Sequence, residues 1–301
     1  MASVLRSLSS LLPLRAQRFL WLRGIGFDAS TVEGITFKVA TTPSERVQAC
    51  ELLHDAYSKR GILEPTASKL RVTAHTLLPT TTLFVGVRAG RVLGTMSLVE
   101  DSALGLPLEE AFGAEVAAVR AGAPGRLAEV GSLAVASSVR KRGVSLMLHN
   151  LMYRWAERRG VGSLLIAVSP DAASFYAALL FFERFTKRRP YGRKLDVTGV
   201  ALRLDLERAR AAFRVAYGSD PTPGEDRDPT RNLNRFFTER DFPELALPEG
   251  DQIPRWGEGE LARLVAQGRL DLAAFSPRER AVLASFYPRL GARRARATVL
   301  A

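Results

Sequence analysis

The chain has 301 residues, of which 47% are hydrophobic and 25% are charged, and its formal net charge is +12. This is the composition of an ordinary globular protein with enough apolar residues for a packed core. It excludes a transmembrane helix, because no run of about 18 uncharged apolar residues occurs. It also excludes an intrachain disulfide, because Cys50 is the only cysteine. A lone free cysteine fits a reducing cytoplasm, where we expect the protein to be located.

The excess of positive charge implies an acidic partner: a nucleic acid, an anionic membrane or an acidic protein. No helix-turn-helix, zinc knuckle or RNA-recognition motif is visible, so we do not expect nucleic acid. The three histidines, His54, His75 and His149, are scattered without metal-ligand spacing, and no metal site is expected.

Residues 1–27 carry four arginines, many leucines and no acidic residue. A secretory signal is excluded because Arg15 and Arg18 interrupt the apolar run. Two interpretations remain. The segment is either an arm that contacts a membrane surface, at the periphery of the inner membrane, or a segment that packs on its own domain. We favour the second, since Pro13 and Gly24 interrupt any helix.

Hydrophobic periodicity predicts alternating strands and helices between residues 35 and 204. Their order implies an α/β fold with a mixed, partly parallel sheet flanked by helices and one parallel crossover in its middle. The predicted strands are Ile35–Thr41, Thr81–Ala89, Val92–Glu100, Ala128–Val135, Ser163–Val168, Phe185–Arg188 and Asp196–Leu204. The predicted helices are Pro43–Lys59 with Thr42 as N-cap, Ala67–Leu78, Leu108–Ala121, Val144–Arg159, and Ala172–Phe182 with Asp171 as cap.

A polar stretch at Gly218–Arg231 predicts a linker, and two helices are expected beyond it, over Glu258–Ala266 and Pro277–Phe286. We therefore expect four parts. They are an amphipathic basic arm over residues 1–33, an α/β domain over 34–205, a connecting helix and polar linker over 206–230, and a helical extension with a basic tail over 231–301.

The stretch from Ala128 to Ser145 predicts a buried strand, a basic turn with Gly143, and an amphipathic helix. A helix N-terminus has unpaired N–H groups and a partial positive charge, so it binds anions. Gly143 lets the backbone approach a phosphate closely, and Arg140, Lys141 and Arg142 add charge. The alternative is a solvated basic helix start. Cations there oppose the helix dipole, so this alternative explains them poorly.

The turn Arg140–Ser145 resembles the signature of the GNAT N-acyltransferase superfamily: Gln or Arg, two residues, Gly, one residue, then Gly or Ala. Ser145 at the last position is a small departure. The pattern Ala173–Tyr176 is similar to that of a later superfamily helix, although Leu180 replaces a usual glycine.

A closer resemblance, over about residues 35–205, is to FeeM-type N-acyl amino acid synthases, relatives of LuxI-type autoinducer synthases. It is carried by Thr80–Thr82, Gly94–Val99, Asp101–Pro107 and Glu129–Val135. The resemblance implies an acyltransferase that moves a long-chain acyl group from a phosphopantetheine thioester to the α-amine of an amino acid. The thioester is expected on an acidic acyl carrier protein, with acyl-CoA as the other possible donor, and no permanently bound cofactor is implied.

Direct attack of the amine on the thioester requires a base, an oxyanion site and an acid for the leaving thiolate. Glu129, in an apolar strand, is the first candidate base, because burial raises a carboxyl pKa. It is alternatively a carboxylate that orients a water or pairs with an arginine. Tyr176 is a candidate acid, or else a core tyrosine. The resemblance implies that backbone N–H groups around Leu133, Ala134 and Val135 bind the oxyanion and the donor.

The phosphopantetheine arm of the donor is also expected to bind at the turn, to Arg140, Lys141, Arg142, Gly143, Val144 and Ser145. Tyr57, Arg60 and Thr95 are candidates for holding the amino acid, with Arg60 able to bind its carboxylate. A basic run that includes Lys187, Arg188, Arg189 and Arg193 is expected at the donor entrance, where it would attract the acidic carrier protein, or else it is a solvated charge run.

Two other functions remain open. One is acetylation of a small amine or protein with acetyl-CoA. The other is a basic module that binds nucleic acid or a membrane surface without catalysis. The second explains the net charge of +12 but not the strand, phosphate turn and helix.

Overall fold

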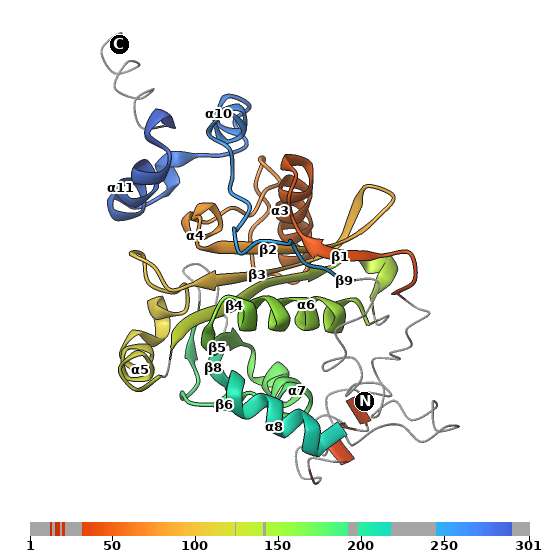
Figure 1. Cartoon of the computed structure of the whole chain (residues 1–301). Helices are drawn as coiled ribbons and strands as arrows, with labels where there is room; N and C mark the ends of the chain where they lie inside the picture. The colour runs from red at the N-terminus through yellow and green to blue at the C-terminus, as the bar shows by residue number, and fades with distance from the viewer. Residues whose placement is uncertain are drawn as a thin grey trace.

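The computed structural model describes residues 13, 16–18, 20–21, 32–123, 125–140, 143–191, 198–217 and 245–290. A mixed sheet runs through the molecule in the order β6-β8-β5-β4-β3-β2-β1-β9, with β7 also paired to β8 (Figure 1). The strands are β1 (Thr36–Val39), β2 (Thr81–Arg88), β3 (Arg91–Glu100), β4 (Arg126–Val135), β5 (Val161–Val168), β6 (Glu183–Arg184), β7 (Arg189–Pro190), β8 (Thr198–Asp205) and β9 (Leu245–Ala246). The predicted parallel crossover is confirmed, because β4 and β5 pair in parallel.

Helices cover both faces of the sheet (Figure 1). The first face carries α3 (Pro43–Ser58) and α4 (Ala74–Leu77), which contact β2 and β3, and α5 (Glu109–Gly122), whose apolar side packs against residues of β4, β5 and β8. The second face carries α6 (Val144–Arg158), α7 (Pro170–Leu180) and α8 (Leu206–Tyr217). The predicted mixed α/β architecture flanked by helices is therefore confirmed.

Local sequence explains how the elements begin. Thr42 caps α3 in a capping box with Glu45, as expected, and Pro43 occupies the first helical position. Gly94 on β3 allows α6 to approach the sheet, because a Cβ built there would lie 2.7 Å from Val144 Cγ1. The start of α6 is thus positioned directly over β3.

Three boundary predictions are wrong. The helix expected over Ala67–Leu78 is only α4, because Lys69 has a positive φ of 50° and Thr73 caps a new helix start. The strand expected over Phe185–Arg188 is absent, and only the short β6 and β7 flank this segment, because the Thr186 side chain, and not a strand carbonyl, accepts the Ala201 N–H at 2.8 Å. The cap of α7 is Ser169 and not Asp171, because Pro170 already occupies the first helical position.

The described residues of the N-terminal arm pack on α7. Arg18 Nε donates to the Ala178 carbonyl at 2.7 Å, and the guanidinium lies 4.6 Å from the centre of the Phe181 ring. Trp21 meets Phe175 edge to face, with the ring centroids 5.5 Å apart. These contacts agree with the interpretation that the arm packs on its own domain. In the part of the chain that the structure describes, no helix is long and apolar enough to cross a bilayer.

The C-terminal residues 245–290 return to the first face. β9 extends the sheet by pairing in parallel with β1, and α10 (Glu258–Ala266) and α11 (Pro277–Phe286) lie beyond α4 (Figure 1). Apolar side chains of this extension share a core cluster with residues of α3, α4 and β2. The two predicted C-terminal helices are therefore confirmed, and the extension is packed against α3, α4 and β2.

Candidate active site

The central strands β4 and β5 separate halfway along their length. Their parallel pairing runs from Arg126 to Glu129 on β4, and from Val161 to Leu165 on β5. Beyond these residues β4 and β5 no longer pair with each other, although each still pairs with its other neighbour, β3 or β8. The unpaired half of β4 thus keeps one edge free, where alternate backbone N–H groups have no strand partner. Such an opening in a sheet can receive an extended ligand that pairs with the strand.

A bulge in β4 marks this opening. Opposite β3 the register shifts between the pairs Thr95–Ala134 and Ser97–Gly131, so that two residues of β4 face one residue of β3. Ser132, inside the bulge, has a left-handed φ of 53°, which is uncommon outside glycine. The bulge turns the end of β4, which holds Leu133, Ala134 and Val135, away from regular pairing. These are the residues expected to bind the oxyanion and donor.

Glu129 lies at the point where the two strands separate. Its side chain is 4% exposed, and its Oε2 accepts the backbone N–H of Leu108 at 2.7 Å. Burial raises the pKa of the Glu129 carboxyl to about 8, the Leu108 N–H opposes this rise, and the nearby charge of Glu109 adds to it. A carboxyl with such a pKa exchanges a proton near neutral pH, which is the property a general base needs.

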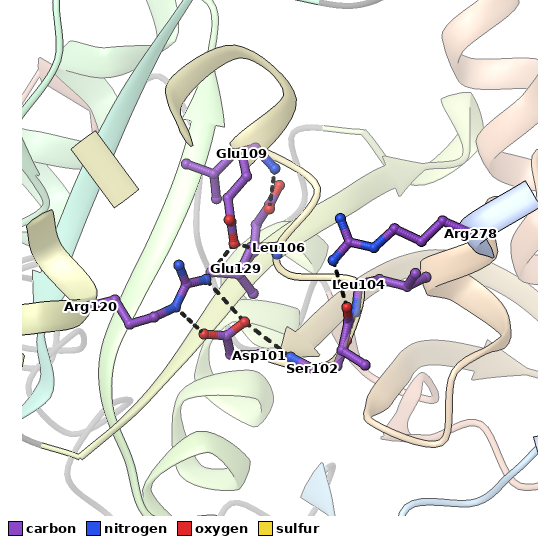
Figure 2. Close-up of polar contacts among 10 residues, drawn as sticks. Asp101, Ser102, Leu104, Leu106, Glu109, Arg120, Glu129 and Arg278 are labelled. Carbon is purple, nitrogen blue, oxygen red and sulfur yellow. Dashed lines mark hydrogen bonds and ion pairs between the residues drawn. The ribbon is translucent and has the colours of Figure 1, made fainter. Parts of the chain in front are cut away.

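Leu108, which donates this N–H, ends the loop between β3 and α5. Figure 2 shows Leu106 of this loop beside Glu109 and Glu129. Arg120 of α5 binds Asp101 at the start of the loop through two hydrogen bonds of 2.6 and 3.1 Å, and it also pairs with Glu109. Glu109 in turn accepts the Leu106 N–H at 2.7 Å. This network fixes the backbone that reaches Glu129.

Gly105 gives this loop its shape. It has a positive φ of 74°, and a Cβ at this position would lie 2.8 Å from the Glu109 carboxylate. A side chain there would therefore be strained and would displace the carboxylate that organises the loop. This accounts for the glycine within the Asp101–Pro107 stretch.

Two aromatic hydroxyls lie within electrostatic range of Glu129. Tyr57 on α3 and Tyr191 after β7 each interact electrostatically with the Glu129 carboxylate. The guanidinium of Arg71 lies 4.9 Å from the centre of the Tyr57 ring. Among the described residues, no carboxylate lies within 4.0 Å of Arg71, which leaves this half-buried cation available beside the site.

Tyr176 approaches Tyr57 from the second face. It lies on α7, is 6% exposed, and packs edge to face against His149, Phe175 and Phe182. Burial raises the pKa of its hydroxyl, and Tyr57 and Arg60 both interact with it electrostatically. Tyr176 therefore stays protonated at neutral pH and lies near Tyr57, so its aromatic packing and a role as proton donor are compatible.

The expected phosphate turn lies at the start of α6. Gly143 adopts a left-handed φ of 80° as N-cap residue, which only glycine adopts without strain, and the helix begins at Val144, followed by Ser145. Arg140 is exposed, and its Nε donates to the Val135 carbonyl at 3.3 Å, so the turn is tied to the end of β4. Lys141 and Arg142 lie outside the described residues.

The other predicted residues are placed differently. Thr95 is fully buried on β3 beside Ala134, and its hydroxyl has no hydrogen-bond partner in the described structure. Arg60 is exposed just beyond α3. Lys187 and Arg188 are exposed, whereas Arg189 pairs with Glu115 and donates to the Ala111 carbonyl, so its charge is already matched.

Arg193 lies outside the described residues. Within the described residues, no group of three or more His, Cys, Asp or Glu side chains could hold a metal ion.

The sheet order, the divergent central strands and the glycine-capped helix are those of a GNAT-like fold. Together with the family match given next, they define the protein as an enzyme of the N-acyltransferase class. The family model described as N-acyl amino acid synthase FeeM matches residues 48–205. The chain belongs to this FeeM family.

Three solved structures are similar to this chain, and the first of them supports the fold. FeeM, an N-acyl amino acid synthase from uncultured soil microbes, is 24% identical, with 59% of this chain and 93% of that chain covered and a TM-score of 0.51. BjaI, a CoA-dependent acyl-homoserine lactone synthase, is 14% identical over 77% of this chain and all of that chain, with a TM-score of 0.49. An acyl-CoA N-acyltransferase from Pseudomonas aeruginosa is 14% identical over 56% of this chain and 98% of that chain, with a TM-score of 0.39. No protein of curated function matches the sequence.

Three groups at the site escaped sequence reasoning. Arg71 lies in an irregular segment, Tyr191 lies within the basic run, and the Leu108 donor is a backbone N–H. The Asp101–Pro107 stretch, which carries the family resemblance, forms this loop, but no sequence signal identifies the N–H that follows it as a partner of Glu129.

Proposed function

We propose that this enzyme transfers a long-chain acyl group from a phosphopantetheine thioester, carried by an acidic acyl carrier protein, to the α-amine of an amino acid. The observation that carries this proposal is the buried Glu129 carboxyl, which lies where β4 parts from β5 and has a pKa of about 8. An acyl thioester along the free edge of β4 would place its carbonyl beside this carboxyl. Family membership supports the reaction class.

The reaction needs no covalent enzyme intermediate. Glu129 accepts a proton from the substrate ammonium, directly or through one water, and the free amine attacks the thioester carbonyl carbon. Backbone N–H groups of Leu133–Val135 bind the oxygen that becomes negative. When the tetrahedral intermediate collapses, the C–S bond breaks, an amide forms, and Tyr176 protonates the leaving thiolate.

The donor arm follows β4 into the turn before α6. Its phosphate binds at the glycine-capped start of the helix, where Gly143, Val144 and Ser145 offer backbone N–H groups and Arg140, Lys141 and Arg142 supply positive charge. The exposed Lys187 and Arg188 support an electrostatic attraction of an acidic carrier protein. Because Arg189 is paired with Glu115, its part in docking is smaller than that of its neighbours.

The amino acid binds on the first face, between α3 and β4. Arg71 is the best-placed cation for its carboxylate, because it stacks on Tyr57, which in turn interacts with Glu129. Tyr57 and the unpartnered hydroxyl of Thr95 are available to position the substrate. Arg60 is exposed and interacts with Tyr57 and Tyr176, so it lies at the rim of the same site.

A donor and acceptor screen tests the proposal. The purified protein is incubated with palmitoyl carrier protein, palmitoyl-CoA or acetyl-CoA, each with pooled amino acids, and the products are identified by mass spectrometry. We expect N-palmitoyl amino acids, formed faster from the carrier protein than from coenzyme A. Reaction with acetyl-CoA alone would contradict the proposal and favour a GNAT acetyltransferase.

A further inference from the structure

The C-terminal extension, the described residues 245–290, lies outside the region that matches the family model. It is anchored to α4 by two buried hydrogen bonds. Trp256 Nε1 donates to the Thr76 carbonyl at 3.0 Å, and the Tyr287 hydroxyl donates to the Leu77 carbonyl at 2.6 Å. A buried ion pair of 2.8 Å between Arg46 and Glu260 adds an anchor on α3. The extension is thus a fixed part of the first face.

The same extension contacts the loop that partners Glu129. Arg278, in the first turn of α11, donates to the Ala103 carbonyl at 2.8 Å, and Figure 2 shows its side chain reaching across to the loop. Leu104 packs against the apolar cluster that contains Leu283 of α11. His75 of α4 lies against the backbone of Gly105 and interacts with Glu279 of α11. Three consecutive loop residues therefore touch the extension or the helix it anchors.

The far end of this loop belongs to the active site. Leu106 and Leu108 pack in a separate apolar cluster with α5, and the Leu108 N–H donates to Glu129 at 2.7 Å. Only three residues separate Leu108 from Leu104. If Ala103–Gly105 moved, the Leu108 N–H would move with them, because the short backbone between them is constrained by Gly105 and Pro107.

We infer that the C-terminal extension is a positioning element of the active site: through Arg278 it holds the β3–α5 loop so that the Leu108 N–H stays on Glu129. The inference rests on the proposed role of Glu129 as base. Arg278 touches neither substrate nor Glu129 and acts through the loop.

The electrostatic consequence has a definite direction. The groups that face Glu129 are the Leu108 N–H and Glu109 at the start of α5, Tyr57 on α3, and Tyr191 after β7. Among these, the N–H stabilises the carboxylate, whereas burial and the Glu109 charge oppose it. If the loop shifts and the N–H moves away, the pKa of Glu129 rises further, and less of the base is ionised at neutral pH.

Three variants of the full-length protein test the inference. Arg278→Ala removes the hydrogen bond to the loop, and Arg278→Lys keeps one charged donor. Arg269→Ala is the matched control, because Arg269 of the same extension pairs with Glu51 at 2.6 Å and, among the described residues, makes no hydrogen bond or ion pair with the loop or α4. We expect Arg278→Ala to raise the apparent pKa in the pH profile of kcat/KM by up to about one pH unit. Arg278→Lys should raise this pKa less, and Arg269→Ala should leave the profile unchanged.

A second readout does not depend on turnover. Hydrogen–deuterium exchange of the amides in residues 102–108 should accelerate in Arg278→Ala and in Tyr287→Phe, but not in Arg269→Ala. Unchanged exchange in this loop together with an unchanged pH profile would overturn the inference. If the wild-type protein shows no acyl transfer, the proposed function fails, while the exchange data still report whether the extension holds the loop.

Discussion

The guanidinium of Arg71 stacks over the ring of Tyr57, 4.9 Å from its centre, and no described carboxylate lies within 4.0 Å of it. A half-buried arginine usually has an acidic partner, since its charge is expensive to leave uncompensated. The proposed substrate carries such a partner in its α-carboxylate. The stack on Tyr57 holds the planar guanidinium for a two-point contact.

We predict that Arg71→Met lowers kcat/KM for the preferred amino acid about 10- to 100-fold, the range expected for loss of a charge-assisted hydrogen bond. For the decarboxylated amine of the same side chain the variant and the wild type should react equally slowly. Steady-state kinetics with both acceptors measures this. Arg88→Met, an exposed change at the far end of β2, is the control. Equal losses for the acid and the amine would remove Arg71 from carboxylate binding.

Glu129→Gln should reduce kcat by about 10²- to 10⁴-fold, because the amide cannot accept the ammonium proton. The wild-type rate should rise with pH through about 8, as the Glu129 carboxyl ionises. The control Glu64→Gln, an exposed carboxyl, should retain the wild-type rate and pH profile. Retention of wild-type turnover by Glu129→Gln at neutral pH would exclude Glu129 as the base.

The raised pKa of Glu129 also predicts how stability depends on pH. Because the pKa is raised from 4.5 to about 8, the folded protein holds a proton that the unfolded chain releases, so this group's stabilising contribution falls as pH rises between these values. In Glu129→Gln that contribution is absent. Thermal unfolding from pH 5 to pH 9 should therefore show a smaller loss of Tm in the variant than in the wild type. Parallel Tm curves would indicate that the carboxyl titrates normally.

The sequence was most informative where chemistry and local structure coincide. The glycine before α6 and the buried strand with Glu129 follow from the helix capping, periodicity and charge pattern of one contiguous stretch. The mixed sheet follows from the hydrophobic periodicity of the successive elements. Arg71 could not be found this way, because the segment after α3 was expected to form a helix and its irregular path depends on tertiary contacts such as that of Thr66 N–H with His54, at 3.0 Å. The hydrogen bond from Arg278 to the Ala103 carbonyl joins residues 175 apart in the sequence. No local sequence pattern predicts such a contact.

Gly94 sets the distance between β3 and α6, and we predict that Gly94→Ala disturbs both stability and donor binding. The added methyl group would lie 2.7 Å from Val144 Cγ1, at the first residue of α6. Relief of this overlap should cost about 1–3 kcal/mol of unfolding free energy and move the helix start that binds the donor phosphate, which raises the donor KM. Gly113→Ala on α5, where a Cβ meets nothing within 4 Å, is the control and should be neutral or stabilising. An unchanged donor KM in Gly94→Ala would show that the helix start does not contact the donor.

The buried ion pair between Arg46 and Glu260 anchors the C-terminal extension, and both side chains are only 6% exposed. Arg46→Met should lower the free energy of unfolding by about 3–5 kcal/mol, because it leaves the Glu260 carboxylate buried without a counter-charge. The double variant Arg46→Met, Glu260→Gln should recover part of this loss, since the neutral amide keeps the hydrogen bond with the Gly257 N–H, 3.2 Å away. The partly exposed pair of Arg269 and Glu51 provides the comparison, and Arg269→Ala should cost about 1 kcal/mol. Urea denaturation of the four proteins measures these differences. A double variant no more stable than Arg46→Met would mean that packing lost with the Arg46 side chain, over the Trp256 ring at 5.4 Å, and not the unpaired charge, accounts for the effect.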